Sequence, residues 1–457
     1  MSAPANEAVL DLALAAFQRR GLGEADAYLE DAVVSAVSVA DGQVESVEHK
    51  GMRGLGVRVI DGGRVGFAHT TDLSPEGIEA VVARAAEAAP FATPDDAHRL
   101  PEPEDAPDVA ANADGAVPSL PEARRTDIAR RIEAAARAHD PRVRRTREST
   151  LQDVVAEVLL GRAGGFRYRY AYTRVYGWID LVAEEGGDAQ SGAAVRFAIG
   201  PDGVDPEAVG REAARRAVEK LGGRPCTTRR VPVLLVPEVV DGLLEELASI
   251  FFADEVLKGK SLLAGLRGER VASDRVTLVD DGRLPGGCNA APVDGEGVAT
   301  RRVPLIREGV LEGYLHTGFS AVRMGEAPTG NAARDSWQSV PATGNNGLML
   351  LPTGESLEDL RSSIAEGLRI DEVMGLHTID PISGDFSLGA SGRALRGGEV
   401  REPVAGIAIA GNVRDLLAAV AAVADDVRPM PSGNACASVL LEGLAIGGEG
   451  RAGQSGT

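Results

Sequence analysis

Several features are scarce in this chain of 457 residues, and each absence limits what it can be. Aromatic residues make up only 4% of the sequence, so Ala, Val and Leu must fill the core. The three cysteines, Cys226, Cys288 and Cys436, are odd in number and widely spaced. That pattern argues against a disulfide framework and favours a reducing cytoplasm.

Long apolar runs are also absent. The sequence holds no stretch of about 18 apolar residues, so no transmembrane helix is expected. The segment from Met1 to Arg20 carries Glu7 and Asp11 within its apolar part and lacks a basic leader, so it does not read as a signal peptide. We therefore expect a cytoplasmic protein.

Positive charge is in the minority. Lys and Arg total 48 against 68 Asp and Glu, which gives a net charge of −20. An acidic surface repels phosphate backbones, so nucleic acid is not expected as a partner. The same negative charge is also typical of a soluble protein whose acidic surface serves solubility alone.

The length exceeds what one hydrophobic core usually supports, so two domains are expected. Hairpin signals mixed with amphipathic helices predict an N-terminal α+β domain at residues 1–225, with a Pro-rich acidic excursion at 90–121. Residues 226–447 are dominated by short strand patterns and predict a β-rich C-terminal domain, with Asn412 to Ala424 as its last helix. Residues 448–457 predict a flexible Gly-rich tail.

The segment from Val231 to Ser261 lies at the centre of the C-terminal domain. Residues 231–236 form a short apolar run typical of a buried strand, and Pro237 suits the first turn of a helix. Apolar residues then recur at helical spacing up to Phe251, which predicts a helix with one wide apolar face. Leu244, Glu245 and Ser249 lie within that helix.

Motifs after this helix follow one another in a fixed order. They include Lys258-Gly259-Lys260-Ser261, Asp294-Gly295-Glu296-Gly297, Thr329-Gly330-Asn331-Ala332, Ser383-Gly384-Asp385-Phe386, Gly389-Ala390-Ser391-Gly392, Ile409-Ala410-Gly411-Asn412 and Cys436-Ala437-Ser438. Together these motifs resemble the TldD/PmbA family, which comprises paired bacterial peptidase subunits, and the resemblance is strongest after about residue 225.

The resemblance implies a zinc site in the catalytic branch of the family, with His-Glu-x-x-x-His on this helix and a distant Cys. In this sequence the two His positions fall at Leu244 and Ser249, the Glu position at Glu245 and the Cys position at Cys436. Zinc needs three or four N, S or O donors around one point. We therefore expect no metal bound by this chain, no assigned catalytic residue and a vestigial Glu245, with zinc in a partner subunit.

Polar residues beside glycine suggest a cleft that binds a peptide main chain. The candidates are Asp280, Asp281, Asn331, Arg334, Gly384 and Asp385. Asp280-Asp281-Gly282 is also ordinary turn chemistry, so this pattern has a structural alternative.

The resemblance favours a non-catalytic subunit that encloses a chamber with a zinc-bearing TldD-type partner and takes in unfolded peptides. The family is also associated with modulation of DNA gyrase. One alternative is an autonomous homodimeric peptidase that uses Cys436 or a metal gathered from scattered residues, with His316 or His377 as the base to test. Another is a peptide-binding scaffold without proteolysis.

Overall fold

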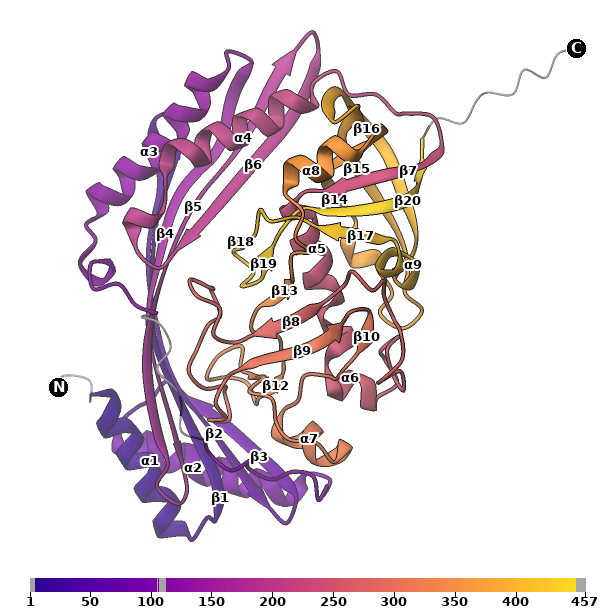
Figure 1. Cartoon of the computed structure of the whole chain (residues 1–457). Helices are drawn as coiled ribbons and strands as arrows, with labels where there is room; N and C mark the ends of the chain where they lie inside the picture. Colours follow the sequence, from indigo (N-terminus) through magenta and orange to yellow (C-terminus); the bar gives the residue numbers. More distant parts are fainter. Residues whose placement is uncertain (1–4, 105, 107–111, 449–457) are drawn as a thin grey trace, which may run out of the picture.

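The computed structural model describes residues 5–104, 106 and 112–448. Figure 1 shows a layer of long strands beside a β-rich C-terminal half, with helices α1 and α3 on the side of the layer away from that half. The predicted α+β class is therefore confirmed. Residues 105 and 107–111 of the acidic excursion, and residues 449–457 of the predicted tail, lie outside the described residues.

One antiparallel sheet runs through the N-terminal half in the order β3-β2-β1-β4-β5-β6. Its first hairpin turns at Asp41 and Gly42, whose φ angles of 48° and 74° match the left-handed turn that Asp-Gly favours. The strands are β1 Glu24–Ala40, β2 Gln43–Asp61, β3 Arg64–Thr70, β4 Val143–Arg162, β5 Arg167–Glu185 and β6 Asp188–Ala198.

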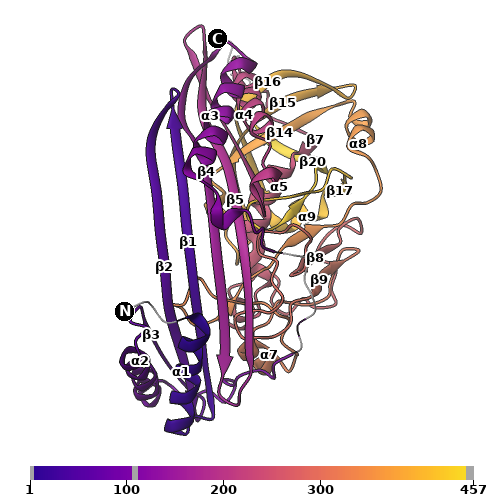
Figure 2. The same cartoon turned by 90° about the vertical axis from the view of Figure 1, so that its left-hand side faces the viewer.

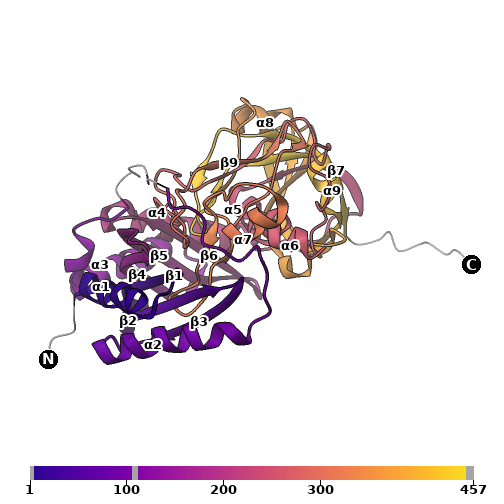
Figure 3. The ribbon, with the colours of Figure 1, turned by 90° about the horizontal axis from the view of Figure 1, so that it is seen from below.

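Two pairs of helices cover opposite ends of this sheet. Helices α1 and α2 share one apolar cluster with β1 and β2, whereas α3 and α4 share another with β4, β5 and β6. Figure 3 shows α2 beneath the strands, on the side opposite the C-terminal half. The helices are α1 Asn6–Arg20, α2 Pro75–Ala88, α3 Glu122–His139 and α4 Pro206–Lys220.

Helix starts in this half follow the sequence signals. Ser74 accepts a hydrogen bond from the backbone N–H of Gly77 at the start of α2, at 3.1 Å. Asp205 does the same for Ala208 at the start of α4, at 3.0 Å. Both helices carry Pro in the first turn, where its missing N–H leaves no hydrogen bond unmade.

The C-terminal half holds two further six-stranded sheets, in the orders β16-β15-β14-β7-β20-β17 and β10-β9-β8-β13-β19-β18, around one continuous apolar core. Its strands are β7 Arg229–Leu235, β8 Leu278–Asp281, β9 Arg302–Arg307, β10 Val310–Leu311, β11 Ala332–Ala333, β12 Ala342–Thr343, β13 Leu348–Leu350, β14 Glu366–Met374, β15 Asp385–Arg396, β16 Glu399–Asn412, β17 Val420–Val423, β18 Arg428–Pro429, β19 Ala435–Cys436 and β20 Val439–Gly447. Its helices are α5 Pro237–Leu247, α6 Ala253–Leu257, α7 Gly318–Met324, α8 Leu357–Ser363 and α9 Val413–Ala418.

The last helix is shorter than its sequence pattern predicts. Asn412 caps the helix, but α9 ends at Ala418 and strand β17 follows. Val420 and Val423 lie three residues apart, a spacing that favours a helix, but their pairing with β20 makes this stretch a strand. Among the described residues, no helix is long and apolar enough to cross a membrane.

Candidate functional site

Helix α5 follows the buried strand β7 and lies in the centre of the C-terminal half (Figure 1). Leu244 is buried among the apolar residues of this half, whereas Glu245 on the next position is exposed. The α-helix ends at Leu247 and tightens into a 3₁₀ turn over Ala248–Phe251. Ser249 therefore lies in that turn and not on the α-helix that the sequence predicts.

A hydrogen-bonded cluster joins the first half of α5 to the loop before β19. The Asp241 carboxylate accepts hydrogen bonds from the Ser432 hydroxyl at 2.6 Å and from the Asn434 amide at 3.0 Å. The Cys436 thiol points at the same oxygen, with its sulfur 3.9 Å away. Asp241 thus holds the segment that carries Cys436 against α5.

The chemistry of this cluster does not favour a thiolate. Burial, and then the nearby Asp241 charge, raise the pKa of the Cys436 thiol far above its usual range. Within the described part of the chain, no histidine hydrogen-bonds to Cys436; His316 is buried in another loop and His377 lies in a short 3₁₀ turn. A nucleophilic cysteine requires a lowered pKa or an adjacent base, and Cys436 shows neither.

The residues at the predicted metal positions do not fit a zinc site. Leu244 has no donor atom, Ser249 offers a neutral hydroxyl, and Cys436 is directed at Asp241. Across the described residues, His, Cys, Asp and Glu nowhere gather in a group of three or more that could hold a metal ion. Because a zinc site needs at least three N, S or O donors, Leu244, Ser249 and Cys436 alone supply too few, and the absence of a bound metal stays a prediction.

Asp280 organises the loops at the end of β8. Its buried carboxylate accepts hydrogen bonds from the Asn331 amide at 2.6 Å and from the backbone N–H groups of Asn346 and Gly347 at 2.9 and 2.7 Å. The structure thus brings Asp280 and Asn331 together in a buried cluster. The hydrogen bond between Asn331 and Asp280 already gives each side chain a partner. Burial raises the pKa of Asp280.

Arg334 lies in a buried charge network between the two halves. Its guanidinium donates to Asp26 on β1 at 2.9 Å and stacks over the ring of Tyr28, 5.0 Å from the centroid. Arg58 on β2 donates to Asp26 at 2.9 Å and to Glu296 of the C-terminal half at 2.8 Å. Although burial opposes ionisation, the Arg58 and Arg334 charges hold the pKa of Asp26 below its ordinary value.

The other predicted cleft residues lie apart from this network. Asp281 pairs with Arg302 at 2.7 Å on the neighbouring strand. Gly384 has a φ of 81°, a conformation that favours glycine, and it precedes β15. The exposed Asp385 accepts from the Asn412 amide at 2.9 Å. The six candidates thus contribute to at least three separate hydrogen-bonding arrangements, and their role in peptide binding stays a prediction.

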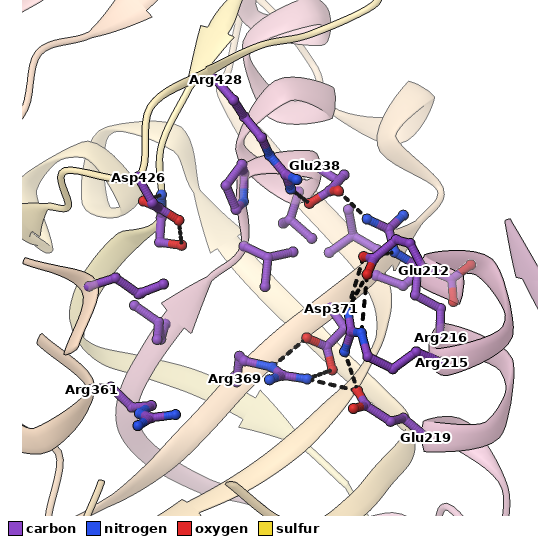
Figure 4. Close-up of a pocket in the computed structure, with 18 of the residues that line it drawn as sticks. Glu212, Arg215, Arg216, Glu219, Glu238, Arg361, Arg369, Asp371, Asp426 and Arg428 are labelled. Atoms are coloured by element: carbon purple, nitrogen blue, oxygen red, sulfur yellow. Dashed lines mark hydrogen bonds and ion pairs between the residues drawn. The ribbon is translucent and has the colours of Figure 1, made fainter. Parts of the chain in front are cut away.

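A cavity of about 800 Å³ lies between α4 of the N-terminal half and the C-terminal half (Figure 4). The first turn of α5, strand β14 and helix α8 are among its other walls. Its charged lining residues are Glu212, Arg215, Arg216, Glu219, Lys220, Glu238, Glu358, Arg361, Arg369, Asp371, Glu372, Asp426 and Arg428.

Ion pairs join the wall of this cavity in the N-terminal half to its wall in the C-terminal half. Arg369 donates to Glu219 of α4 at 3.0 Å, and Lys220 donates to Glu372 at 2.7 Å. Glu238 at the start of α5 pairs with Arg216 of α4 (Figure 4). These basic side chains are therefore engaged by carboxylates, and the lining ties the halves together.

Sequence reasoning missed Asp241 and the charged lining of the cavity. Asp241 had a visible signal, because it is a lone carboxylate between Val240 and Leu243 on the apolar face of the predicted helix. A carboxylate in such a position needs hydrogen-bond donors, and these come from the loop before β19. The cavity had no local signal, since its walls come from distant segments.

Three family models match successive parts of the chain. They describe domain 1, the central domain and the C-terminal domain of the PmbA/TldA metallopeptidases, and match residues 25–89, 115–221 and 228–448. The chain therefore belongs to the PmbA/TldD metallopeptidase family. The resemblance seen in the motifs is confirmed over both halves of the molecule.

Individual relatives support the same family assignment. The chain is 30% identical to the metalloprotease PmbA of Escherichia coli O157:H7, over 91% of this chain and 90% of the relative. It is 27% identical to a metalloprotease TldD homologue of Haemophilus influenzae, over 89% of this chain and 86% of the relative.

Solved structures show the same fold. A Thermotoga maritima protein, named as a proposed modulator of a DNA gyrase, matches with a TM-score of 0.88 and 26% identity over 97% of this chain and all of that one. TldE from Thermococcus kodakarensis matches with a TM-score of 0.88 over 96% of this chain and all of that one; at 22% identity this likeness concerns the fold alone.

Proposed function

We propose that this chain is the non-catalytic subunit of a PmbA/TldD-type metallopeptidase complex. Its role is to enclose a chamber with a zinc-bearing, TldD-type partner in which unfolded peptides are processed. One observation carries the proposal: α5 presents Leu244, and its 3₁₀ extension presents Ser249, where the resemblance places imidazole ligands. With Cys436 directed at Asp241, the remaining donors are too few for zinc.

The names of the relatives support a metallopeptidase system made of more than one kind of subunit. Proteins called PmbA and proteins called TldD both resemble this chain, at 30% and 27% identity respectively. The partner supplies the metal and the activated water in this proposal. This chain supplies walls of the chamber, and the exposed Asp385 is its proposed contact with the peptide main chain.

The test compares the purified chain, a homologue with the His-Glu-x-x-x-His motif, and the two co-expressed. We expect the lone chain to carry no stoichiometric zinc by elemental analysis and to leave an unfolded peptide intact. The co-expressed pair should elute together in size-exclusion chromatography and cleave the peptide. Stoichiometric zinc in the lone chain, or turnover by it, would refute the proposed role.

Two variants of α5 separate the subunit from an autonomous enzyme. Glu245→Gln should leave cleavage by the co-expressed pair within about twofold of the unmodified pair, because the partner's own glutamate does the chemistry. An autonomous peptidase that used Glu245 as its base would lose on the order of a hundredfold. Leu244→His should create no activity, since Ser249 still leaves the ligand set incomplete.

The double change Leu244→His with Ser249→His asks whether the rest of the site can hold zinc. Because Ser249 lies in a 3₁₀ turn rather than on the α-helix, we expect the double variant to bind zinc weakly and to cleave no peptide. Tight zinc binding with restored cleavage would show that only two side chains separate this chain from a catalytic subunit.

A further inference from the structure

The cavity between α4 and the C-terminal half has two sides of different character. In Figures 1 and 2 alike, α4 lies beside strand β14 of the C-terminal half. On the α4 side, acidic and basic side chains hold one another in ion pairs, as Arg369 and Glu219 do. Helix α8 and the loop before β18 supply another side, and Figure 4 shows Arg361 and Asp426 there, away from the paired charges of α4.

Asp426 is a carboxylate without a cation. Every other carboxylate that lines the cavity lies in an ion pair, whereas the described residues place no basic side chain within ion-pair distance of Asp426. Its two oxygens accept hydrogen bonds from the backbone N–H and the hydroxyl of Ser438, each at 2.8 Å. Asp426 is half-buried, so water screens its charge only in part. An ammonium group in the cavity would neutralise it.

The cavity also holds arginine nitrogens without an acceptor. The Nε atoms of Arg361 and Arg428 are buried, and no described residue accepts a hydrogen bond from either. One terminal nitrogen of each guanidinium forms an ion pair, with Glu358 at 2.6 Å and with Glu238 at 2.5 Å respectively. A buried N–H group without an acceptor is destabilising, so a carboxylate ligand would be favourable at either position.

The remaining lining is largely apolar. Leu234, Val236, Pro237, Val239 and Leu357 are among the residues that line the cavity. Apolar ligand surface gains free energy when it leaves water, so this lining favours a ligand with apolar side chains. The volume of about 800 Å³ lies within the range of pockets that hold small molecules.

We propose that this cavity binds a small zwitterion with an apolar body, which is the chemistry of a free hydrophobic amino acid or of a di- or tripeptide. Its ammonium group pairs with Asp426, and its carboxylate accepts a hydrogen bond from the Nε of Arg361 or of Arg428. Its side chains lie on the apolar lining. The site thus recognises fragments whose two charged ends are free. It belongs to this chain alone and requires neither zinc nor the partner of the proposed function.

The test is isothermal titration calorimetry of the purified full chain at neutral pH with leucine, dileucine and trileucine. We expect at least one of these ligands to bind with a dissociation constant below about 1 mM. Acetylation of its amino end should weaken binding roughly tenfold or more, and so should amidation of its carboxyl end, because each removes a charge-assisted hydrogen bond.

Variants of the lining assign the two ends of the ligand. Asp426→Asn keeps an oxygen for the Ser438 donors but removes the charge. It should weaken binding of the free ligand roughly tenfold and leave binding of the acetylated ligand unchanged. Arg361→Gln and Arg428→Gln test the carboxyl end: whichever arginine holds the carboxylate should lose the free ligand and leave the amidated one unaffected. Asp127→Asn, at an exposed position of α3, is the matched control and should change no affinity.

A chain that binds none of the three ligands up to about 10 mM would overturn the proposal. So would blocked ligands that bind as tightly as the free one, or an Asp426→Asn variant that still discriminates against acetylation. Thermal unfolding checks that each variant is folded, and the comparison of free and blocked ligands needs only the unmodified chain. Because no partner is present, binding can fail while the subunit role stands. Stoichiometric zinc in the lone chain would refute that role and leave this site untouched.

Discussion

The two halves of the molecule bury their apolar residues in different ways. The C-terminal half gathers strands and helices from Val231 to Ile446 into one continuous core. The N-terminal half divides its apolar residues between two helix pairs at opposite ends of one long sheet. The first arrangement forms one closed core. The second leaves an open edge at residues 43–52 of β2, beside which the described residues place no further strand.

The contact between the halves differs from both cores, because buried charges carry much of it. Asp26 and Arg58 on neighbouring strands meet Glu296 and Arg334 from the C-terminal half. Such pairs require partners in a fixed geometry, whereas apolar surfaces tolerate sliding. Two buried ion pairs thus join the N-terminal sheet to the C-terminal half, Arg58 with Glu296 and Asp26 with Arg334.

The largest effect is expected from Arg58→Met. Removal of the guanidinium leaves the buried carboxylates of Asp26 and Glu296 short of a cation, which should lower the free energy of unfolding by about 3–5 kcal/mol. Urea unfolding followed by circular dichroism measures the change. The control Arg19→Met removes an exposed pair with Glu79 and should change stability by less than about 1 kcal/mol. Equal effects would contradict a charged interface.

A smaller effect is expected on the pH dependence of the free energy of unfolding. Burial, and then the Glu296 charge, raise the pKa of Asp294 to about 7 from an ordinary value of 3.8, although three backbone N–H groups donate to it. Between these values the folded protein holds a proton that the unfolded chain has lost. This contribution to stability therefore falls as pH rises from about 4 to 7, by at most about 1.4 kcal/mol per pH unit.

Asp294→Asn removes that titration, so the variant should show a flatter stability profile than the unmodified chain across this range. Thermal unfolding at a series of pH values gives the comparison. Parallel profiles for the two proteins would mean that Asp294 ionises in the folded state as it does in the unfolded one.

The smallest effect compares two valines that lie directly opposite each other on β1 and β2. Val37 is fully buried beneath α3, whereas Val47 on the open edge is 52% exposed. Val37→Thr buries a hydroxyl and should destabilise by about 1–3 kcal/mol. Val47→Thr should stay within about 0.5 kcal/mol when measured at a concentration where the chain is monomeric. Similar losses would show that the edge is covered in the monomer.

Local signals in the sequence were enough to place most of the elements. Pro237 with apolar spacing predicted α5, because these signals act through near neighbours along the chain. Local signals did not place strand β17, which the sequence assigns to a helix. Pairing of Val420 with the distant β20 decided its conformation.

The candidate site was less predictable. The resemblance assigns Leu244, Ser249 and Cys436 to the metal positions, and that assignment stays a prediction. Arg334 looked like a cleft residue from its neighbours, yet it binds Asp26, 308 positions away. Asp241 and Cys436 meet across 195 positions, and no periodicity carries information over such a separation.

The amino-acid sequence by itself determined the family, the α+β class and the identity of the residues on α5, because composition, turns and motif order are properties of the chain alone. Only the tertiary structure decided which carboxylate holds Cys436, which charges join the halves and which strand keeps a bare edge. Those outcomes depend on burial and on contacts between distant segments, and both arise only when the sheets pack.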